Sequence, residues 1–280
     1  MNVKNDEPKY FERFMKYKSP INFENSFNMC PKTCKRESPQ NLKSMLLNMG
    51  GNLNRLKTES DPIYRYISTE SPDFIFLTET MCLNSLKIPE IKGYKYFFTR
   101  ANPSGGRPSG GILIYFKKEL DFKIRIARRR RIDNILWVKF SNGPSKLYFC
   151  CVYNKLPLPE FSHLRARFYD HLFLDNAEFS KLGNTFILGD FNARLARVGD
   201  KKPNVIATAE FDNLLNCNLE ILNEKFAKGV PTFVNNCSEK NGSSIIDLVL
   251  SSCSHLVNNF RVVDKTLSST PHPAHRIVSF

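Results

Sequence analysis

The stretch 185–195 reads TFILGDFNARL. Its apolar first half gives way abruptly to Asp190 and Asn192, which stand on either side of Phe191. Side chains two residues apart on an extended strand point to the same face of a sheet. The stretch therefore predicts a buried strand that ends by presenting a carboxylate and an amide side by side.

Four other apolar segments carry a polar side chain at the same kind of position. SMLLN ends on Asn48, DFIFLTE ends on Glu79, LYFCCVY ends on Tyr153, and SSIIDLVL holds Asp247 within an apolar run. A carboxylate in such a run is costly to bury unless something pairs with it. Any one of these side chains could simply cap a turn, but five together indicate a shared cleft. Acids and amides gathered in a cleft suit a Mg²⁺ ion and a phosphate.

Composition limits the classes of protein to consider. The chain has 280 residues, of which 41% are hydrophobic, enough for a core in one large domain or two small ones. It has no apolar run of about 18 residues, so we expect no membrane span. The N-terminus is too charged for a secretory signal, and we expect an intracellular protein with reduced, mostly buried cysteines. Cys30 and Cys34 form an isolated pair that does not complete a zinc pattern.

The balance of charges favours a polyanionic partner. Lysine and arginine number 41 against 27 acidic residues, which gives a net charge of +14. Such an excess favours nucleic acid first and an anionic membrane surface second. The densest basic run is Arg128, Arg129, Arg130 and Arg131. We expect this run to be either a solvated loop between strands or a contact with phosphates.

Residues 1–40 differ in composition and hydrophobic pattern from the rest of the chain. They are polar and lack periodicity, so we expect a loosely ordered N-terminal extension followed by a domain at 41–280. In that domain, short apolar runs separated by turn signals predict an α+β sandwich of two packed sheets with helices outside. Helices are predicted at 62–71, 160–181 and 210–226. Strands are predicted at 43–48, 73–79, 94–99, 111–116, 122–127, 135–140, 146–153, 185–190, 232–235, 245–250, 260–264 and 276–280.

Eight motifs follow one another in the order of one protein family: LKSMLLNMGGNLNRL, SPDFIFLTET, RPSGGILIYFK, NILWVKF, VYNKLP, FILGDFNARL, PTFV and SSIIDLVLSS. From Asn41 to the C-terminus, the chain resembles the endonuclease/exonuclease/phosphatase family. Within that family it most resembles the endonuclease domain of non-LTR retrotransposons, which nicks target DNA to prime reverse transcription. The resemblance implies a four-layered α/β sandwich, with two mainly antiparallel sheets packed face to face and helices outside. It also implies a nuclear, Mg²⁺-dependent DNA endonuclease, with Mn²⁺ as an alternative ion and no small-molecule cofactor.

The resemblance implies one set of residues that hold a metal ion and activate water. Glu79 would be the main carboxylate ligand of the ion, and Asn48 would help to hold both that glutamate and the metal. Asp247 would be a second acidic support close to the metal. Asp190 would orient or deprotonate the attacking water.

A second set would act on the scissile phosphate. Asn192 and Tyr153 would contact or support the phosphate, and Thr232 of PTFV would lie near it. His275 would hydrogen-bond the phosphate and balance its charge. After Tyr153, the proline that is usual in the family is replaced by Asn154.

The C-terminal motif departs from the family pattern. That pattern closes with Ser-Asp-His, whereas this chain has Pro273, Ala274 and His275. The aspartate of the pattern is expected to hold the histidine in one tautomer and to favour its charged form. Because Ala274 cannot do this, we expect an unbraced, mostly neutral His275 and reduced cleavage. Two alternatives to an active endonuclease stay open: a catalytically inactive nucleic-acid-binding domain, and a phosphatase of the same fold.

Overall fold

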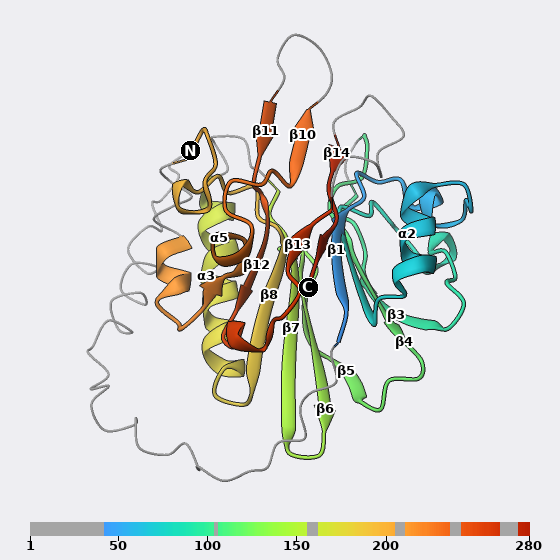
Figure 1. Ribbon diagram of the computed structural model, residues 1–280, viewed down its shortest axis with the longest axis horizontal. Coiled ribbons are helices and arrows are strands. Elements are labelled where there is room, and N and C mark those ends of the chain that lie inside the picture. The colour runs from blue at the N-terminus through green and yellow to red at the C-terminus, as the bar shows by residue number, and fades with distance from the viewer. Residues whose placement is uncertain (1–41, 104–105, 156–161, 205–210, 236–241, 264–273) are drawn as a thin grey trace, which may run out of the picture. The chain divides into compact units, whose positions relative to one another are not determined.

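The computed structural model describes residues 42–280 with five gaps, at 104–105, 156–161, 205–210, 236–241 and 264–273 (Figure 1). The predicted extension 1–40 lies outside the described residues, as does Asp264 at the end of one predicted strand. The described residues belong to one unit, Leu42–Phe280. None of the described helices is both long and apolar enough to cross a membrane.

The first sheet is built from β1 (Ser44–Asn48), β2 (Phe74–Thr78), β3 (Tyr94–Thr99), β4 (Ile112–Lys117), β13 (Arg261–Val262) and β15 (Val278–Ser279). Their order across the sheet is β13-β15-β1-β2-β4-β3. Neighbouring strands are antiparallel except for β1 and β2, which run parallel. Every residue of β1 and β2 is buried, as expected for apolar parallel strands covered on both faces.

The second sheet is built from β5 (Lys123–Arg130), β6 (Ile135–Asn142), β7 (Ser145–Tyr153), β8 (Asn184–Asp190), β9 (Glu220–Ile221) and β12 (Asp247–Ser251). Their order is β5-β6-β7-β8-β12-β9, and only β7 and β8 run parallel. A third, small sheet has the order β11-β10-β14. Its strands are β10 (Phe233–Asn235), β11 (Gly242–Ser244) and β14 (Ala274–His275).

Helices cover the outer faces of the two large sheets (Figure 1). The α-helices are α2 (Pro62–Glu70), α3 (Ser162–Phe179) and α5 (Leu222–Phe226), and short 3-10 helices occur at Leu53–Leu56, Ser85–Lys87, Ala196–Val198 and Ser254–Leu256. The start of α2 is encoded locally, because Asp61 accepts a hydrogen bond from the backbone N–H of Ile63 at 2.8 Å and Pro62 fits the first helical position. The helix ends at Ser71, which adopts a left-handed φ of +45°.

Three apolar clusters lie between these layers, because alternate strand residues point to opposite faces. The cluster between the two sheets contains Phe74, Phe76 and Phe149. On the outer face of the first sheet, the strands pack against α2, and on the outer face of the second sheet they pack against α3. Adjacent Cys150 and Cys151 take part in different clusters, and both are free thiols. The predicted four-layered sandwich with two mainly antiparallel sheets is confirmed.

Each predicted strand overlaps an observed one, but the predicted helix 210–226 is wrong. Residues 211–215 are helical, and the chain then turns, forms β9 and enters the short α5. Asn218 adopts a left-handed φ of +57°, which ends any continuous helix. Asparagine has a low helix propensity, and the pairing of β9 with the edge of β12 prevails here. The short strands β11 and β14 were also not predicted.

The arginine run 128–131 is divided between two environments. Residues up to Arg130 belong to β5, so the expected loop is wrong for most of the run. A register shift between Ile126 and Arg128 marks a bulge, which turns Arg128 and Arg130 towards α3. Both guanidinium groups donate to the fully buried carboxylate of Asp175 at 2.6 Å. Arg129 and Arg131 are exposed.

Gly189 lets β8 approach β7 closely just before Asp190. Its φ is +152°, and a Cβ at this position would overlap the carbonyl oxygen of Val152. Gly189 and Val152 face each other in the parallel pairing. The glycine of the GDFN motif therefore determines how tightly the two strands pack at the point where Asp190 leaves the sheet.

Replacing this glycine should destabilise the protein. Gly189→Ala is expected to lower the free energy of unfolding by about 3 kcal/mol, because of the φ angle and the overlap with Val152. Urea unfolding at pH 7 measures the change. Gly106→Ala is the control, since a Cβ there would meet no atom within 4 Å, and it should cost less than about 1 kcal/mol. Equal effects of the two substitutions would contradict the role assigned to Gly189.

Candidate active site

The polar residues predicted to share a cleft are brought together by strand pairing. Asn48 and Thr78, the last residues of β1 and β2, are Cα partners, and Glu79 follows directly. In the second sheet, Tyr153 is the partner of Asp190, and Asp190 is the partner of Asp247. Because these pairs lie at the same end of the two sheets, five segments far apart in the sequence deliver their polar side chains to one place.

A buried hydrogen bond joins the two sheets at this end. The Nδ2 of Asn48 donates to Oδ2 of Asp190 at 2.8 Å, and both side chains are almost fully buried. The Oδ1 of Asn48 accepts from the backbone N–H of Gly50, also at 2.8 Å. Asn48 therefore has its own orientation fixed by the turn after β1 while it holds the Asp190 carboxylate.

Asn192 turns back on Asp190 instead of continuing the strand. Its φ is +48°, and its backbone N–H donates to Oδ1 of Asp190 at 2.9 Å. The expected side-by-side arrangement on an extended strand is therefore wrong, because β8 ends at Asp190 and the chain bends. The Nδ2 of Asn192 donates to the backbone carbonyl of Asn154 at 2.8 Å.

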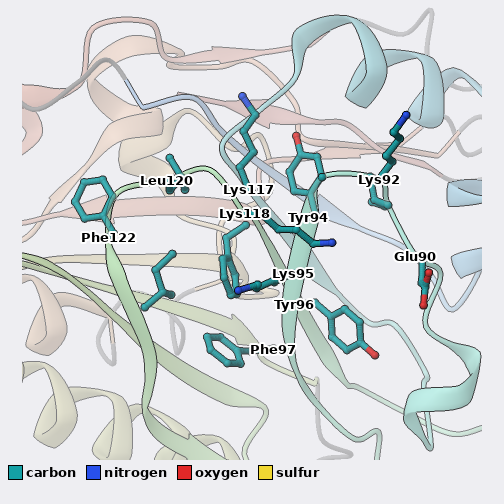
Figure 2. Close-up of a pocket in the computed structure, with 14 residues that line it drawn as sticks. Glu90, Lys92, Tyr94, Lys95, Tyr96, Phe97, Lys117, Lys118, Leu120 and Phe122 are labelled. Atoms are coloured by element: carbon teal, nitrogen blue, oxygen red, sulfur yellow. The ribbon is translucent and has the colours of Figure 1, made fainter.

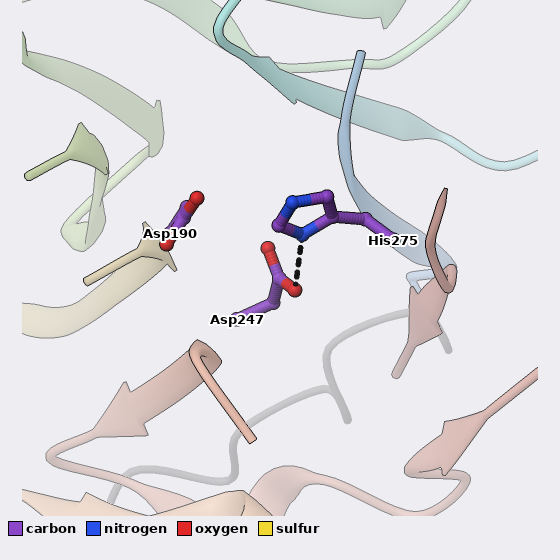
Figure 3. A group of neighbouring side chains, drawn as sticks. All are labelled: Asp190, Asp247 and His275. Carbon is purple, nitrogen blue, oxygen red and sulfur yellow. Dashed lines mark hydrogen bonds and ion pairs between the residues drawn. The ribbon is translucent and has the colours of Figure 1, made fainter. Parts of the chain in front are cut away.

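Asp247 and His275 form the second buried pair of the site (Figure 3). The Nδ1 of His275 lies 2.8 Å from Oδ2 of Asp247, which has no exposed surface. Burial acts against the charge of His275, but attraction to Asp247, with smaller contributions from Asp190 and Glu79, outweighs it and raises the pKa of His275 to about 9. The expectation of an unbraced, neutral His275 is wrong. Asp247 fills the role that Ala274 cannot, from a strand 27 residues away in sequence from Ala274.

Asp190 lies next to this pair, and its surroundings disfavour the ionised form of its carboxyl group. Burial, together with the neighbouring charge of Asp247, raises the pKa of Asp190 to about 7. The charge of His275 and the hydrogen bonds from Asn192 and Asn48 act in the opposite direction. A carboxylate with a pKa near neutrality is suited to accept a proton.

Glu79 and Tyr153 complete the group of polar side chains from the two sheets. Glu79 has a left-handed φ of +49°, and its backbone carbonyl accepts from the N–H of Gly51 at 2.7 Å. Its carboxylate forms a hydrogen bond with Tyr153. Burial, together with the charges of Glu79 and Asp190, raises the pKa of Tyr153 far above its ordinary range. Tyr153 therefore stays protonated and able to donate a hydrogen bond.

Thr232 lies against the segment that carries Asp247. It is fully buried, and its Oγ1 accepts from the backbone N–H groups of Ile246 and Asp247, each at 3.0 Å. Its backbone carbonyl accepts from the N–H of Arg276 at 2.6 Å. These contacts are with backbone groups, and a role of Thr232 towards the phosphate stays a prediction. Thr232 positions the two segments that carry Asp247 and His275.

Three asparagines that support the site were not predicted as site residues. Asn154 donates from Nδ2 to the carbonyl of Phe191 at 2.9 Å and from its backbone N–H to the carbonyl of Asp190 at 2.8 Å. Asn134 accepts from the backbone N–H groups of Gly111 and Tyr153. Asn223 donates to the carbonyl of Asp247. Of these three, only Asn154 stands out in the sequence, since it replaces a proline of the family pattern.

The donor set fits a divalent cation of the hard, oxygen-preferring kind. One ligand atom each from Asp190, Asp247 and His275 lies within 4.8 Å of the others (Figure 3). A charged imidazole that faces Asp247 is a poor ligand, so we assign the oxygens rather than His275 to metal binding. The Oδ1 of Asp247 is buried and has no hydrogen-bond partner in the part of the chain that the structure describes. Together with the carboxylate of Glu79, it offers the acidic oxygens that Mg²⁺ prefers.

Residues 45–271 match the endonuclease/exonuclease/phosphatase family. The chain therefore belongs to this family of phosphodiesterase hydrolases, whose members generally use divalent metal ions. No curated protein matches the sequence.

Three solved structures illustrate the shared fold, and each covers 85% of this chain. One is the endonuclease domain of TRAS1, a telomere-specific non-LTR retrotransposon, with 18% identity, a TM-score of 0.61 and 96% of its own chain covered. Another is the 3′ phosphatase NExo from Neisseria bound to a product DNA hairpin, with 18% identity, a TM-score of 0.62 and 98% covered. The third is an AP endonuclease from Archaeoglobus fulgidus, with 15% identity, a TM-score of 0.64 and 98% covered. These identities establish the fold alone.

The Asp247–His275 pair should make stability depend on pH. The folded pKa of His275, about 9, lies above its unfolded value of about 6.5. The contribution of the charged pair is therefore complete below about pH 6.5 and is lost as pH rises through 9. The free energy of unfolding of the wild type and of His275→Gln is measured with urea in EDTA at pH 6 and at pH 9.5. The advantage of the wild type over the variant should be larger at pH 6 than at pH 9.5, by about 2–4 kcal/mol.

The same experiment on Asp247→Asn tests whether Asp247 causes the pH dependence of stability. This variant lacks the carboxylate that favours the charged imidazole, so the extra stability at pH 6 should be absent. If Asp247→Asn kept the full pH dependence of the wild type, another group would have to hold the charge of His275.

Proposed function

We propose that this chain is a divalent-metal-dependent DNA endonuclease of the non-LTR retrotransposon type. The observation that carries the proposal is the adjacency of two buried pairs, Asn48 with Asp190 and Asp247 with His275. This adjacency places a proton acceptor, Asp190, next to a positively charged side chain, His275. The net charge of +14 favours a nucleic-acid substrate over a small phosphorylated molecule.

Asp190 is the residue proposed to orient and deprotonate the attacking water. Asn48 and the backbone of Asn192 hold both of its oxygens, which limits the directions from which it can accept a proton. Its raised pKa, about 7, makes it a stronger base than an exposed aspartate. His275, charged at neutral pH, balances negative charge that develops on the phosphate, and Tyr153 and Asn192 provide further donors towards it.

Glu79, Asp247 and Asn48 are the residues proposed to hold Mg²⁺ or Mn²⁺. Asn48 uses Oδ1, which keeps a second lone pair after accepting from Gly50. When bound, the ion stabilises charge on the phosphoryl and leaving oxygens. The pairing of His275 with Asp247 removes the reason for expecting reduced activity, so we propose an active enzyme.

The first test is nicking of a supercoiled plasmid. The wild type should convert it to the relaxed form with Mg²⁺ and not with EDTA. Glu79→Gln should lower the rate by at least about 100-fold, since it removes a carboxylate charge from the proposed metal site. Glu119→Gln is the matched control, because Glu119 is 81% exposed and lies outside the site. Nicking by Glu79→Gln at the wild-type rate would reject Glu79 as a ligand.

Two alternative functions would give different results in this assay. A 3′ phosphatase would release phosphate from a 3′-phosphorylated DNA hairpin without nicking the plasmid, and the likeness to the Neisseria enzyme motivates this second substrate. A catalytically inactive binding domain would do neither but would retain DNA binding. We further propose that residues 1–40 are an extension of the catalytic domain, and that the protein acts on DNA in the nucleus.

Arg129 and Arg131 are the members of the arginine run proposed to contact DNA, because Arg128 and Arg130 are bound to Asp175. Arg129→Ala combined with Arg131→Ala should reduce the slope of log affinity against log salt by up to about 2. Fluorescence anisotropy on duplex DNA measures the slope. Lys57→Ala combined with Lys181→Ala removes the same charge from exposed positions elsewhere. If both double variants changed the slope equally, the arginines would have no special contact.

A further inference from the structure

A hollow of about 920 Å³ opens at the edge of the sandwich, between the edge strands β3 and β5 (Figure 2). Phe97 on β3, Ile124 on β5, and Leu120 and Phe122 on the connection before β5 line it with apolar groups. These side chains are half-buried and pack against the cluster between the sheets. The apolar interior of the sandwich therefore reaches the surface here.

This hollow is far from the candidate active site. Phe116, which lines it, is the Cα partner of Phe74 at the start of β2, whereas Glu79 follows the end of the same strand. Five residues of extended strand correspond to about 17 Å. A molecule in the hollow would thus leave the catalytic cleft open to DNA.

Positive charge surrounds the apolar lining. Lys92, Lys95 and Lys118 line the hollow and form no ion pair with any residue that the structure describes. A fourth lysine, Lys117, is paired with Asp73 at 3.0 Å. Glu90 is the one acidic residue among the described lining residues. The rim therefore favours carboxylates over amines.

The outer edge of β3 adds a third feature. In the described part of the chain, β3 pairs with β4 and with no other strand. Apart from the N–H of Tyr94, which donates to the carbonyl of Ile91, its outer backbone N–H and C=O groups are thus available to an added strand. An extended peptide can pair with both the N–H and the C=O groups of such an edge, whereas phosphates can only accept from the N–H groups.

We propose that this hollow is a docking site for an extended acidic peptide of a partner protein. The peptide adds as a strand to the edge of β3, inserts one aromatic or aliphatic side chain against Phe97 and Phe122, and places flanking carboxylates near Lys95 and Lys118. A second copy of this chain is a poor occupant, because its own β3 would bring the same lysines against them. The proposal does not depend on the proposed nuclease activity.

The test uses the full chain and a fluorescein-labelled peptide, Asp-Glu-Val-Phe-Val-Glu-Asp, with anisotropy as the readout. Wild type should bind it saturably, and Lys95→Glu combined with Lys118→Glu should weaken binding by about tenfold or more. Both lysines are exposed, so the fold should persist. Lys57→Glu combined with Lys181→Glu makes the same change in net charge elsewhere and should have little effect. The same peptide methylated at alternate backbone nitrogens should also bind about tenfold more weakly, since it cannot pair with β3.

Several outcomes would overturn the proposal. The wild type could fail to bind the acidic peptide at millimolar concentration, or both double variants could weaken binding equally. A seven-nucleotide oligo-dT that displaces the peptide as well as unlabelled peptide does would identify a nucleic-acid surface instead. Sedimentation that shows a wild-type dimer, lost in the Lys95→Glu and Lys118→Glu variant, would assign the hollow to a second copy.

Discussion

The hydrogen bond between Asn48 and Asp190 connects the two sheets at the end that carries the candidate active site. Its partners are 142 residues apart, one at the end of β1 and the other at the end of β8. A carboxylate buried to this extent is costly unless donors surround it, so the bond stabilises Asp190 and joins the two sheets at this end. Glu79 beside Asn48, and Tyr153 beside Asp190, then face the same cleft.

Charge compensation explains the rest of the site. Asp190 and Asp247 are partners in neighbouring strands, and burial together with the charge of Asp247 raises the pKa of Asp190. His275 supplies a positive charge next to Asp247, and a divalent cation would be attracted to the cleft for the same reason. The supporting asparagines contribute donors without adding charge. The site is thus a small set of acids that is tolerated in the interior because each acid has a compensating partner.

Two regions of the sandwich differ in the kind of surface that they present. At the catalytic end, the strands finish in polar residues whose backbone and side chains are held by short, buried hydrogen bonds. At the edge between β3 and β5, the apolar interior is exposed between two edge strands and surrounded by lysines. The two regions lie at different ends of β2, so the proposed peptide site and the proposed nuclease site could be occupied at the same time.

The strands, and the meeting of most polar side chains of the candidate site, could be predicted from the sequence. Alternating and continuous apolar runs place the strands, because burial on one face or both leaves a local pattern. The GDFN motif and the polar strand ends indicate which side chains meet, since strand ends share an edge. The prediction of a helix at 210–226 failed because the helix ends through the conformation of Asn218 and the pairing of β9 with β12, which no local pattern reveals.

Only the tertiary structure decided which partner each polar residue takes. His275 is held by Asp247 and not by its sequence neighbour, Thr232 accepts from two backbone N–H groups, and half of the arginine run is bound to Asp175. Such choices depend on distances between strands and helices that are far apart in the chain. A hydrogen bond or ion pair forms only within about 3–4 Å, and that separation is set by the packing of the sheets rather than by the local sequence.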